Sequence, residues 1–390
     1  MSQLKEIKTW LAHRRRTEDF LVRKIDLAAS KNWRLQNGAM RHASGKFFQI
    51  VGLRWRTTTK ILEQPFIRQR EIGTLGFFMR VRKRQNELLV QAKAEPGNVG
   101  LVQLAPTCQA TASNLARVHG GADPPACSSF LKPNKSTVIY ASLQSEQGTR
   151  FLGKRNRNIL LLSERKIKAT PRRHRWIKVD ALLSWLAEDF LINTDARSVL
   201  VSAPWRSLVK HSPFTKQTTT FAKELAASFS SKLSAPEKKA LTKEISKRRR
   251  NAAKSQIISL GQVFGQRQGR QNFKVEQIQV RSQSREVSTW DQPIINSASA
   301  GQITLLCGRK KSILHFLFSW REEPGLFNQI ELGPSLMTQP GDAKTRLRIP
   351  RGKVRVACRQ SEEGGRFFRD VNEYRIIDIG LIQSLTMDGV

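Results

Sequence analysis

An internal repeat constrains this chain of 390 residues more than any other feature. Gln64-Pro65 is followed by Glu95-Pro96-Gly97, and Gln292-Pro293 is followed by Glu323-Pro324-Gly325 at the same spacing. The two sets of motifs lie 228 residues apart. The register continues, since Leu104 and Leu332 also match. Ordered matches over such a length predict two copies of one structural unit.

A second matched segment keeps the order but shortens the offset. Residues 144–151 (QSEQGTRF) and 360–367 (QSEEGGRF) are identical at six of eight positions, and here the copies are 216 residues apart. The second copy therefore lacks about twelve residues that the first contains. It also ends soon after its last match, so we expect it to lack the closing helix of the first copy.

The repeat divides the chain into four predicted parts. These are an N-terminal helical segment at 1–29, repeat 1 at 30–205, a helical linker at 206–261 and a C-terminally truncated repeat 2 at 262–390. In the linker, Ser234 and Glu237 have the spacing of a capping box, with Pro236 in the first turn. We expect that helix to run to about Arg250.

Each repeat is predicted to be mainly strand, with helices at its ends. Residues 47–55 alternate loosely, and 73–81 and 87–93 flank a turn at 83–86 that is typical of a hairpin. Residues 303–307 and 314–320 repeat that hairpin in the second copy. Residues 179–191 have the apolar spacing of a helix. The fold class is therefore α+β, with mixed sheets and flanking helices.

The net charge of +37 implies attraction to polyanions. The basic runs are spread along the chain, whereas a dedicated nucleic-acid binder usually concentrates its charge on one face. Aromatic residues are only 7%, which gives few platforms for stacking single-stranded bases. Nucleic-acid binding is thus supported by charge alone.

The cysteines and the hydropathy favour a cytoplasmic protein. The cysteines (Cys108, Cys127, Cys307 and Cys358) form no C-x-x-C pair, so we expect neither a zinc site nor a disulfide framework, and a reduced intracellular protein is the simplest interpretation. No run approaches eighteen apolar residues, so no membrane span is expected.

Several long motifs resemble the NDP-hexose 2,3-dehydratase family. In the first copy they are 41–48 (RHASGKFF), 91–98 (QAKAEPGN), 102–111 (VQLAPTCQAT), 117–121 (RVHGG), 144–158 and 193–200; in the second they are 287–294 (VSTWDQPI) and 360–367. The resemblance covers most of both copies.

The resemblance implies a tandem repeat of two Nudix-like domains without the metal-hydrolysis motif. It implies a homodimer that acts on a dTDP-4-keto-6-deoxyhexose with no cofactor and no metal, and a downstream 3-ketoreductase in deoxysugar biosynthesis. The implied reaction is a β-elimination. A base removes the C3 hydrogen that the C4 ketone acidifies, the C2 hydroxyl leaves, and the enol relaxes to a 3,4-diketo sugar.

Three residues are candidates for acid–base catalysis. His119 titrates near working pH and lies in a Gly-rich segment that the second copy lacks, although an ordinary loop histidine is the alternative. Glu95 and Glu146 both recur in the second copy; for Glu95 the alternative is a structural turn, because Glu-Pro-Gly is a turn sequence.

The remaining polar candidates are assigned to substrate binding. Cations would hold the diphosphate, amides would contact the sugar or thymine, and Trp290 would stack on the nucleobase. The candidates are Gln91, Lys93, Asn98, Gln103, Gln109, Asn114, Arg117, Gln144, Arg150, Arg155, Trp290, Glu323 and Glu362.

The chain departs from the family pattern after Thr111. It reads 112–117 (ASNLAR) where the family usually has a further arginine and a tyrosine. Two alternatives therefore stand beside an active dehydratase: an inactive relative that still binds sugar nucleotide, and a basic nucleic-acid-binding protein.

Overall fold

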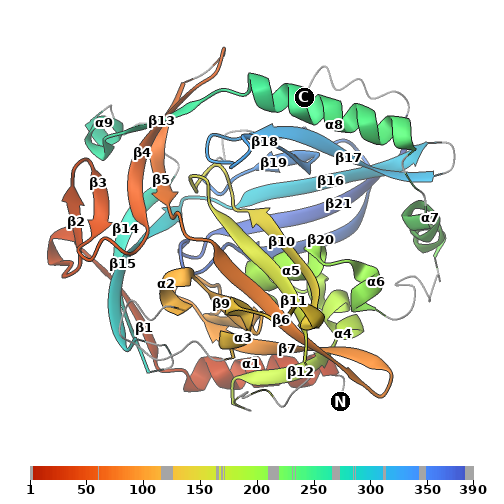
Figure 1. The fold of residues 1–390 in the computed structure, drawn as a ribbon, viewed down its shortest axis with the longest axis horizontal. Helices are drawn as coiled ribbons and strands as arrows, with labels where there is room; N and C mark the ends of the chain where they lie inside the picture. Colours follow the sequence, from red (N-terminus) through yellow and green to blue (C-terminus); the bar gives the residue numbers. More distant parts are fainter. Residues whose placement is uncertain are drawn as a thin grey trace.

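The computed structural model describes most of the chain (Figure 1). The described residues are 3–59, 61–115, 126–163, 167, 170, 172–209, 219–230, 232, 234–265, 273–283, 285, 287–310, 313–341 and 348–382. The fold is mixed α+β and dominated by sheets, as the sequence predicted.

The largest sheet belongs to the first half of the chain. Its strands are β6 (Gly73–Arg82), β7 (Gln85–Ala94), β8 (Val102–Ala105), β9 (Cys108–Ala110), β10 (Val138–Ser145), β11 (Arg155–Leu162) and β12 (His174–Lys178). The order is β10-β11-β6-β7-β12, with β8 on β7 and β9 on β6. Strands β6 and β11 are parallel, and the other pairs are antiparallel.

The second half contains a sheet with a corresponding strand order. Its strands are β16 (Gly301–Lys310), β17 (Ile313–Glu322), β18 (Ile330–Pro334), β19 (Leu336–Thr338), β20 (Lys353–Ser361) and β21 (Val371–Leu381), in the order β18-β17-β16-β21-β20 with β19 on β16. Here β16 and β21 are the parallel pair. Asn372 lies opposite Gly301 as Asn156 lies opposite Gly73.

Two smaller sheets accompany these. One contains β1 (Phe20–Ile25), β14 (Phe273–Ser282) and β15 (Thr289–Ser297). The other contains β2 (Trp33–Gln36), β3 (Ala39–His42), β4 (Gln49–Arg56), β5 (Ile61–Arg68) and β13 (Ser255–Ile258). Both therefore combine strands from distant parts of the chain.

The helices are short apart from three. They are α1 (Gln3–Thr17), α2 (Ala112–Leu115), α3 (Ser128–Leu131), α4 (Val179–Ser184), α5 (Thr194–Ser202), α6 (Trp205–Leu208), α7 (Thr220–Ser230), α8 (Ala235–Asn251) and α9 (Leu260–Gly265), with 3-10 turns at Leu27–Ala29, Lys135–Thr137 and Trp185–Ala187. Helix α8 passes beside β17 and β18 (Figure 1). None of the described helices has the length and apolar character needed to cross a membrane.

The two halves interlock through their Glu-Pro-Gly turns. The Gly97 N–H donates to the Gly364 carbonyl at 2.8 Å, and the Gly325 N–H donates to the Gly148 carbonyl at 2.7 Å. Each turn thus enters the Gln-Ser-Glu loop of the other half. A Cβ on Gly97 would lie 1.6 Å from the Phe367 carbonyl oxygen, which explains why glycine is needed there.

The largest hydrophobic core packs the first sheet against α1, α4 and α5. It includes Leu11, Phe77, Leu104, Leu182 and Leu200. A second core lies between the halves, where Phe151 and Phe367 meet edge to face with ring centroids 5.8 Å apart. The matched phenylalanines of the two repeats are therefore in contact at the centre of the molecule.

Several local predictions are confirmed. The hairpin at 83–86 joins β6 to β7, with Lys83 and Arg84 at positive φ. Ser234 and Glu237 form a capping box at the start of α8, and the helix ends at Asn251.

Three predictions need correction. The helix expected over 179–191 ends as α4 at Ser184 and a 3-10 turn, because Glu188 is extended and Phe190 has a φ of 53°. The N-terminal segment is not wholly helical, since β1 pairs with β14. The linker likewise contributes a strand, β13, to the first half, where it pairs with β4.

Candidate active site

A cavity of about 420 Å³ lies between the first-half sheet and loops of the second half. The first half lines it with residues of β6, β7, β9 and α2, with the loop from Glu146 to Lys154, with Asn156 of β11, and with Asp195. The second half lines it with residues 285–292 and 363–366. The halves therefore build one cavity together.

Six carboxylic acids line the cavity: Glu71, Asp291 and a group of four (Glu95, Glu146, Asp195 and Glu363) whose charges act on one another. In this group Glu95 and Asp195 are buried, and the other two are half-buried. The four come from four segments, namely the end of β7, the end of β10, the first turn of α5 and the loop after β20. Burial of several like charges disfavours their simultaneous ionisation.

Hydrogen bonds hold Glu95 in place through two amides. The Gln109 side chain donates to Glu95 Oε1 at 2.8 Å and accepts from the Asn193 amide at 3.0 Å. Asn193 in turn caps α5 by accepting from the Ala196 N–H at 2.9 Å. The second oxygen, Glu95 Oε2, is buried and has no hydrogen-bond partner among the described residues.

Four cationic side chains line the same cavity: Lys93, Lys154, Arg285 and Arg366. Lys93 Nζ lies 3.6 Å from Glu95 Oε1, and Lys154 Nζ donates to the Glu71 carbonyl at 2.8 Å. The Arg366 guanidinium stacks on the Phe48 ring at 4.1 Å. Mixed charge of this kind suits a substrate that carries a ketone and a diphosphate.

Burial raises the pKa of three of the acids. The pKa of Glu363 is raised to about 7, and the charges of Glu95 and Glu146 act in the same direction while Arg366 opposes them. The pKa of Asp195 lies well above its ordinary value because of burial and the charge of Glu363. Burial also raises the pKa of Glu146, against the charge of Lys154 and the hydrogen bond from Asn156.

The pKa values of Lys154 and His42 shift in the opposite direction. Burial lowers the pKa of Lys154, although the charge of Glu146 opposes the change. Burial also lowers the pKa of His42, against the charge of Asp291. His42 Nδ1 accepts from the Ser44 N–H at 3.1 Å, which leaves the proton of the neutral ring on Nε2.

Aromatic side chains form another wall of the cavity. Trp33, Phe47 and Trp290 line it together with His42 and Phe48. Trp290 donates its indole N–H to Gln292 Oε1 at 3.0 Å, which fixes the orientation of its ring. These rings provide apolar surface on which a nucleobase could stack.

The structure brings six of the predicted site residues to this cavity. They are Glu95, Glu146, Lys93, Gln109, Asn114 and Trp290. His119 and Arg117 lie outside the described residues.

The other predicted residues do not line the cavity and make contacts elsewhere. Five of them donate hydrogen bonds: Gln91 to the Pro106 carbonyl, Asn98 to the Leu101 carbonyl, Gln103 to Ser361, Gln144 to Ser142 and Arg150 to the Pro340 carbonyl. Arg155 stacks on the Phe327 ring. Glu323 forms an ion pair with Arg321, and Glu362 accepts a hydrogen bond from Asn372. Three of these contacts, from Gln103, Arg150 and Arg155, join the two halves.

Sequence reasoning missed Asp195, Glu363, Lys154, Arg366 and His42. Lys154, Asp195 and His42 lie within motifs that resemble the family, so a search for titratable side chains within those motifs would have found them. Glu363 and Arg366 lie within 360–367, which also resembles the family, and Glu363 occupies a position where the first copy has Gln147.

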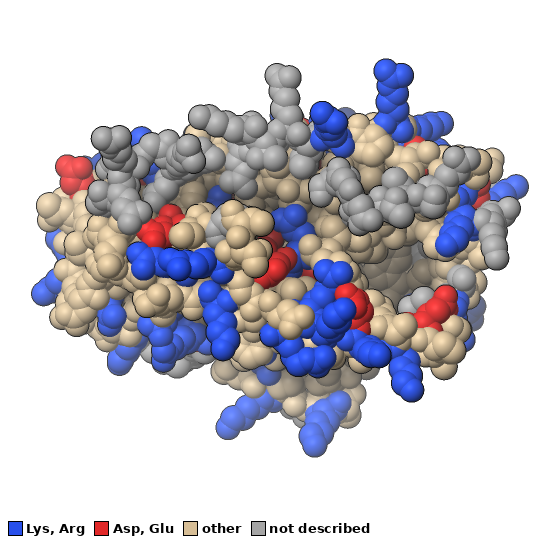
Figure 2. Space-filling model, turned by 90° about the horizontal axis from the view of Figure 1, so that it is seen from above, with Lys and Arg blue, Asp and Glu red and all other residues tan. Residues whose placement is uncertain are grey.

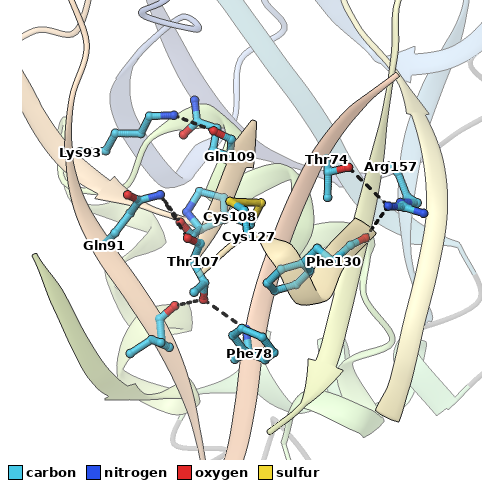
Figure 3. The surroundings of a disulfide bond; sticks show 12 residues. Thr74, Phe78, Gln91, Lys93, Thr107, Cys108, Gln109, Cys127, Phe130 and Arg157 are labelled. Atoms are coloured by element: carbon cyan, nitrogen blue, oxygen red, sulfur yellow. Dashed lines mark hydrogen bonds between the residues drawn. A yellow bond between two sulfur atoms is a disulfide. The ribbon is translucent and has the colours of Figure 1, made fainter. Parts of the chain in front are cut away.

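A disulfide lies behind the cavity wall, which corrects the expectation of four reduced cysteines (Figure 3). It joins Cys108 in β9 to Cys127 just before α3, with their Cα atoms 5.0 Å apart. The 19-residue separation carries no recognisable pattern, which is why the sequence did not reveal the pair. Gln109, which holds Glu95, follows Cys108 directly.

Two further observations concern metals and surface charge. Among the described residues, no group of three or more His, Cys, Asp or Glu side chains is arranged to hold a metal ion. On the face seen in Figure 2, Lys and Arg side chains are scattered between acidic ones and do not form one continuous stripe.

Comparisons with known proteins give a consistent result. The profile of a family described as NDP-hexose 2,3-dehydratase matches residues 4–202 and 259–386. A protein of Saccharopolyspora spinosa is 30% identical over 96% of this chain and 82% of its own, and one of Streptomyces violaceoruber is 32% identical over 95% and 86%. A protein of Amycolatopsis orientalis is 29% identical over 96% and 81%. Each is named dTDP-4-dehydro-6-deoxy-alpha-D-glucopyranose 2,3-dehydratase.

Proposed function

Because the chain belongs to the NDP-hexose 2,3-dehydratase family, we propose that it removes water across C2 and C3 of a dTDP-4-keto-6-deoxyhexose. The observation that carries the proposal is the group of four buried or half-buried carboxylic acids (Glu95, Glu146, Asp195 and Glu363) with Lys93, Lys154 and Arg366 in the shared cavity. This cluster supplies proton donors, proton acceptors and cations within one site.

The elimination needs three functions. A base takes the C3 hydrogen, a donor stabilises the oxyanion that forms at C4, and an acid protonates the departing C2 hydroxyl so that it leaves as water. The product enol then moves a proton from the C3 hydroxyl to C2, which gives the 3,4-diketo-2,6-dideoxy sugar. The net reaction is therefore the loss of one water molecule from the substrate.

Glu95 is the proposed base. Its Oε1 is held by Gln109 and Lys93, while the unpartnered Oε2 remains to accept a proton. Glu363 is the proposed acid, since a pKa of about 7 keeps it partly protonated at neutral pH. Lys93 and Lys154 are placed among the acids to stabilise the C4 oxyanion.

The remainder of the cavity would bind the nucleotide. Arg366 and Arg285 line it and can donate to the diphosphate, and Trp290 offers a ring to the thymine. The sequence-predicted roles of Gln109 and Asn114 in substrate binding and of Glu146 in acid–base catalysis are retained as proposals, and the Asn156 amide donates a hydrogen bond to Glu146. His119 remains a proposed acid–base residue on sequence grounds.

We also propose that the two halves are copies of one Nudix-like unit. The matched strand orders, the two parallel pairs β6–β11 and β16–β21, and the reciprocal turns support a duplication. The resemblance further supports a cytoplasmic homodimer, and exposed Phe318, Val354 and Leu381 of the second half offer apolar surface for such a contact. Sedimentation velocity would test the dimer.

The repeat supplies a matched control for the proposed base. Glu95→Gln should abolish turnover of dTDP-4-keto-6-deoxyglucose and retain the thermal stabilisation that dTDP gives, because the nucleotide contacts remain. Glu323→Gln, at the equivalent position of the second half and outside the cavity, should retain turnover. Equal turnover by the two variants would remove Glu95 from the mechanism.

The same assay separates the alternatives. An inactive relative would show stabilisation by dTDP and no turnover by the unmodified protein. A nucleic-acid binder would bind DNA with a steep salt dependence and show no response to dTDP.

A further inference from the structure

We propose that a second cavity, on the other side of the β2–β5 sheet, is an anion site for a small phosphorylated molecule. This cavity has a volume of about 400 Å³ and is lined by residues of β3, β4, β5, β13 and α9. Consecutive residues of a strand point to opposite faces, and in β3 His42 lines the active-site cavity while Arg41 lines this one. The two cavities are therefore separate.

Three arginines line this second cavity: Arg41, Arg54 and Arg68. Arg41 and Arg68 are both cross-strand partners of Gln49, one through β3–β4 and the other through β4–β5. Their side chains thus stand on one face with a single residue between them. None of the described residues that line this cavity is Asp or Glu.

Within the part of the chain that the structure describes, one of the three arginines has an acidic partner. Arg54 pairs with Glu63 across β4 and β5. Arg41 and Arg68 form no ion pair or hydrogen bond with any described residue, and Arg41 Nε is buried without a partner. Burial lowers the pKa of Arg68, and the positive charges of Arg70 and Arg41 act in the same direction.

The opposite rim adds neutral hydrogen-bond donors. Gln256 and Gln262 line the cavity, and Gln262 Oε1 is already used by the Ser259 N–H at 3.1 Å, which leaves its amide N–H₂ for a ligand. Two uncompensated guanidinium groups match a dianionic phosphate in charge and in planar geometry. The volume exceeds that of a phosphate alone, so the favoured ligand is a phosphate or diphosphate ester of a small molecule.

Pyrophosphate is a suitable probe, and dTDP can occupy the active-site cavity during the experiment. Isothermal titration of pyrophosphate into the full chain with saturating dTDP should show one binding event. Arg41→Gln with Arg68→Gln should weaken this affinity by at least about tenfold, since two charge-assisted contacts are lost. Arg82→Gln with Arg84→Gln removes the same charge from an exposed turn and should leave it unchanged.

Two further measurements keep the test decisive. Without ligand, the Arg41/Arg68 variant should melt no lower than the unmodified protein, because the change removes two repelling cations. Lysines at both positions should restore part of the affinity, since they retain charge without the planar fork. Unchanged pyrophosphate affinity in the glutamine variant, or no binding by the unmodified protein, would overturn the proposal. Failure of dTDP to bind would instead count against the proposed function, and pyrophosphate would then be titrated alone.

Discussion

Gly97→Ala tests whether the reciprocal turns hold the two halves together. The new Cβ would lie 1.6 Å from the Phe367 carbonyl oxygen and 2.8 Å from the Gly364 carbonyl oxygen, both backbone atoms of the other half. The turn must therefore withdraw. It would lose the Gly97 N–H bond to Gly364 and the Arg369 N–H bond to the Gly97 carbonyl, each 2.8 Å long.

The expected cost follows from these losses. Two hydrogen bonds contribute about 2 kcal/mol, and forced repacking adds about 1–3 kcal/mol, so unfolding in urea should require about 3–5 kcal/mol less free energy. Turnover should also fall, because Glu95 lies two residues before Gly97. Gly325→Ala, whose Cβ would lie 1.8 Å from the Phe151 carbonyl oxygen, should destabilise similarly without moving a cavity residue of its own turn.

A control variant separates this effect from the general effect of glycine replacement. Gly261→Ala in α9 meets only Ser259 Oγ at 3.5 Å, which is ordinary contact, so its stability should change by about 1 kcal/mol at most. A Gly97→Ala protein within about 1 kcal/mol of the unmodified protein would refute the reasoning.

Three other predictions concern the Cys108–Cys127 disulfide, the buried Glu362 and His119. Cys127→Ala should lower the free energy of unfolding by about 3 kcal/mol, as measured by denaturation without reductant, and added dithiothreitol should bring the unmodified protein to the same value. Burial raises the folded-state pKa of Glu362 to about 7, so the folded protein binds more protons than the unfolded chain between about pH 4.5 and 7. The free energy of unfolding should therefore fall as pH rises through that window. In Glu362→Gln this fall should be smaller. An equal fall in both proteins would contradict that assignment. His119→Ala should lose turnover and retain dTDP binding, and unchanged turnover would remove His119 from the mechanism.

Local sequence signals predicted the local structure. The capping box at Ser234 and the hairpin at Lys83 depend on neighbouring residues, and both are confirmed. The predicted helix over 179–191 was too long because the apolar spacing continues past Ser184. Contacts with the second half determine the backbone conformation beyond that residue. The Phe190 N–H, for example, donates to the Arg359 carbonyl.

The site residues that the sequence did not predict reach the cavity through contacts between distant parts of the chain. Glu95, Glu146 and Lys93 were accessible to sequence reasoning because the repeat and the motifs marked them. Glu363 reaches the cavity only because the second-half loop packs against the Glu95 turn, and nothing in its neighbours indicates that. The Cys108–Cys127 pair is similar, since the segment between the cysteines has no regular spacing.

The direct test of the central claim is whether the unmodified protein dehydrates dTDP-4-keto-6-deoxyglucose. A vicinal diketone condenses with ortho-phenylenediamine to a quinoxaline, so the product can be trapped and identified by mass spectrometry. We predict a trapped adduct of a sugar nucleotide that has lost one water, formed faster below about pH 7 than above it because Glu363 must be protonated. Glu363→Gln, which lacks the proposed acid, should form no adduct. Recovery of unchanged substrate from a protein that binds dTDP would contradict the account.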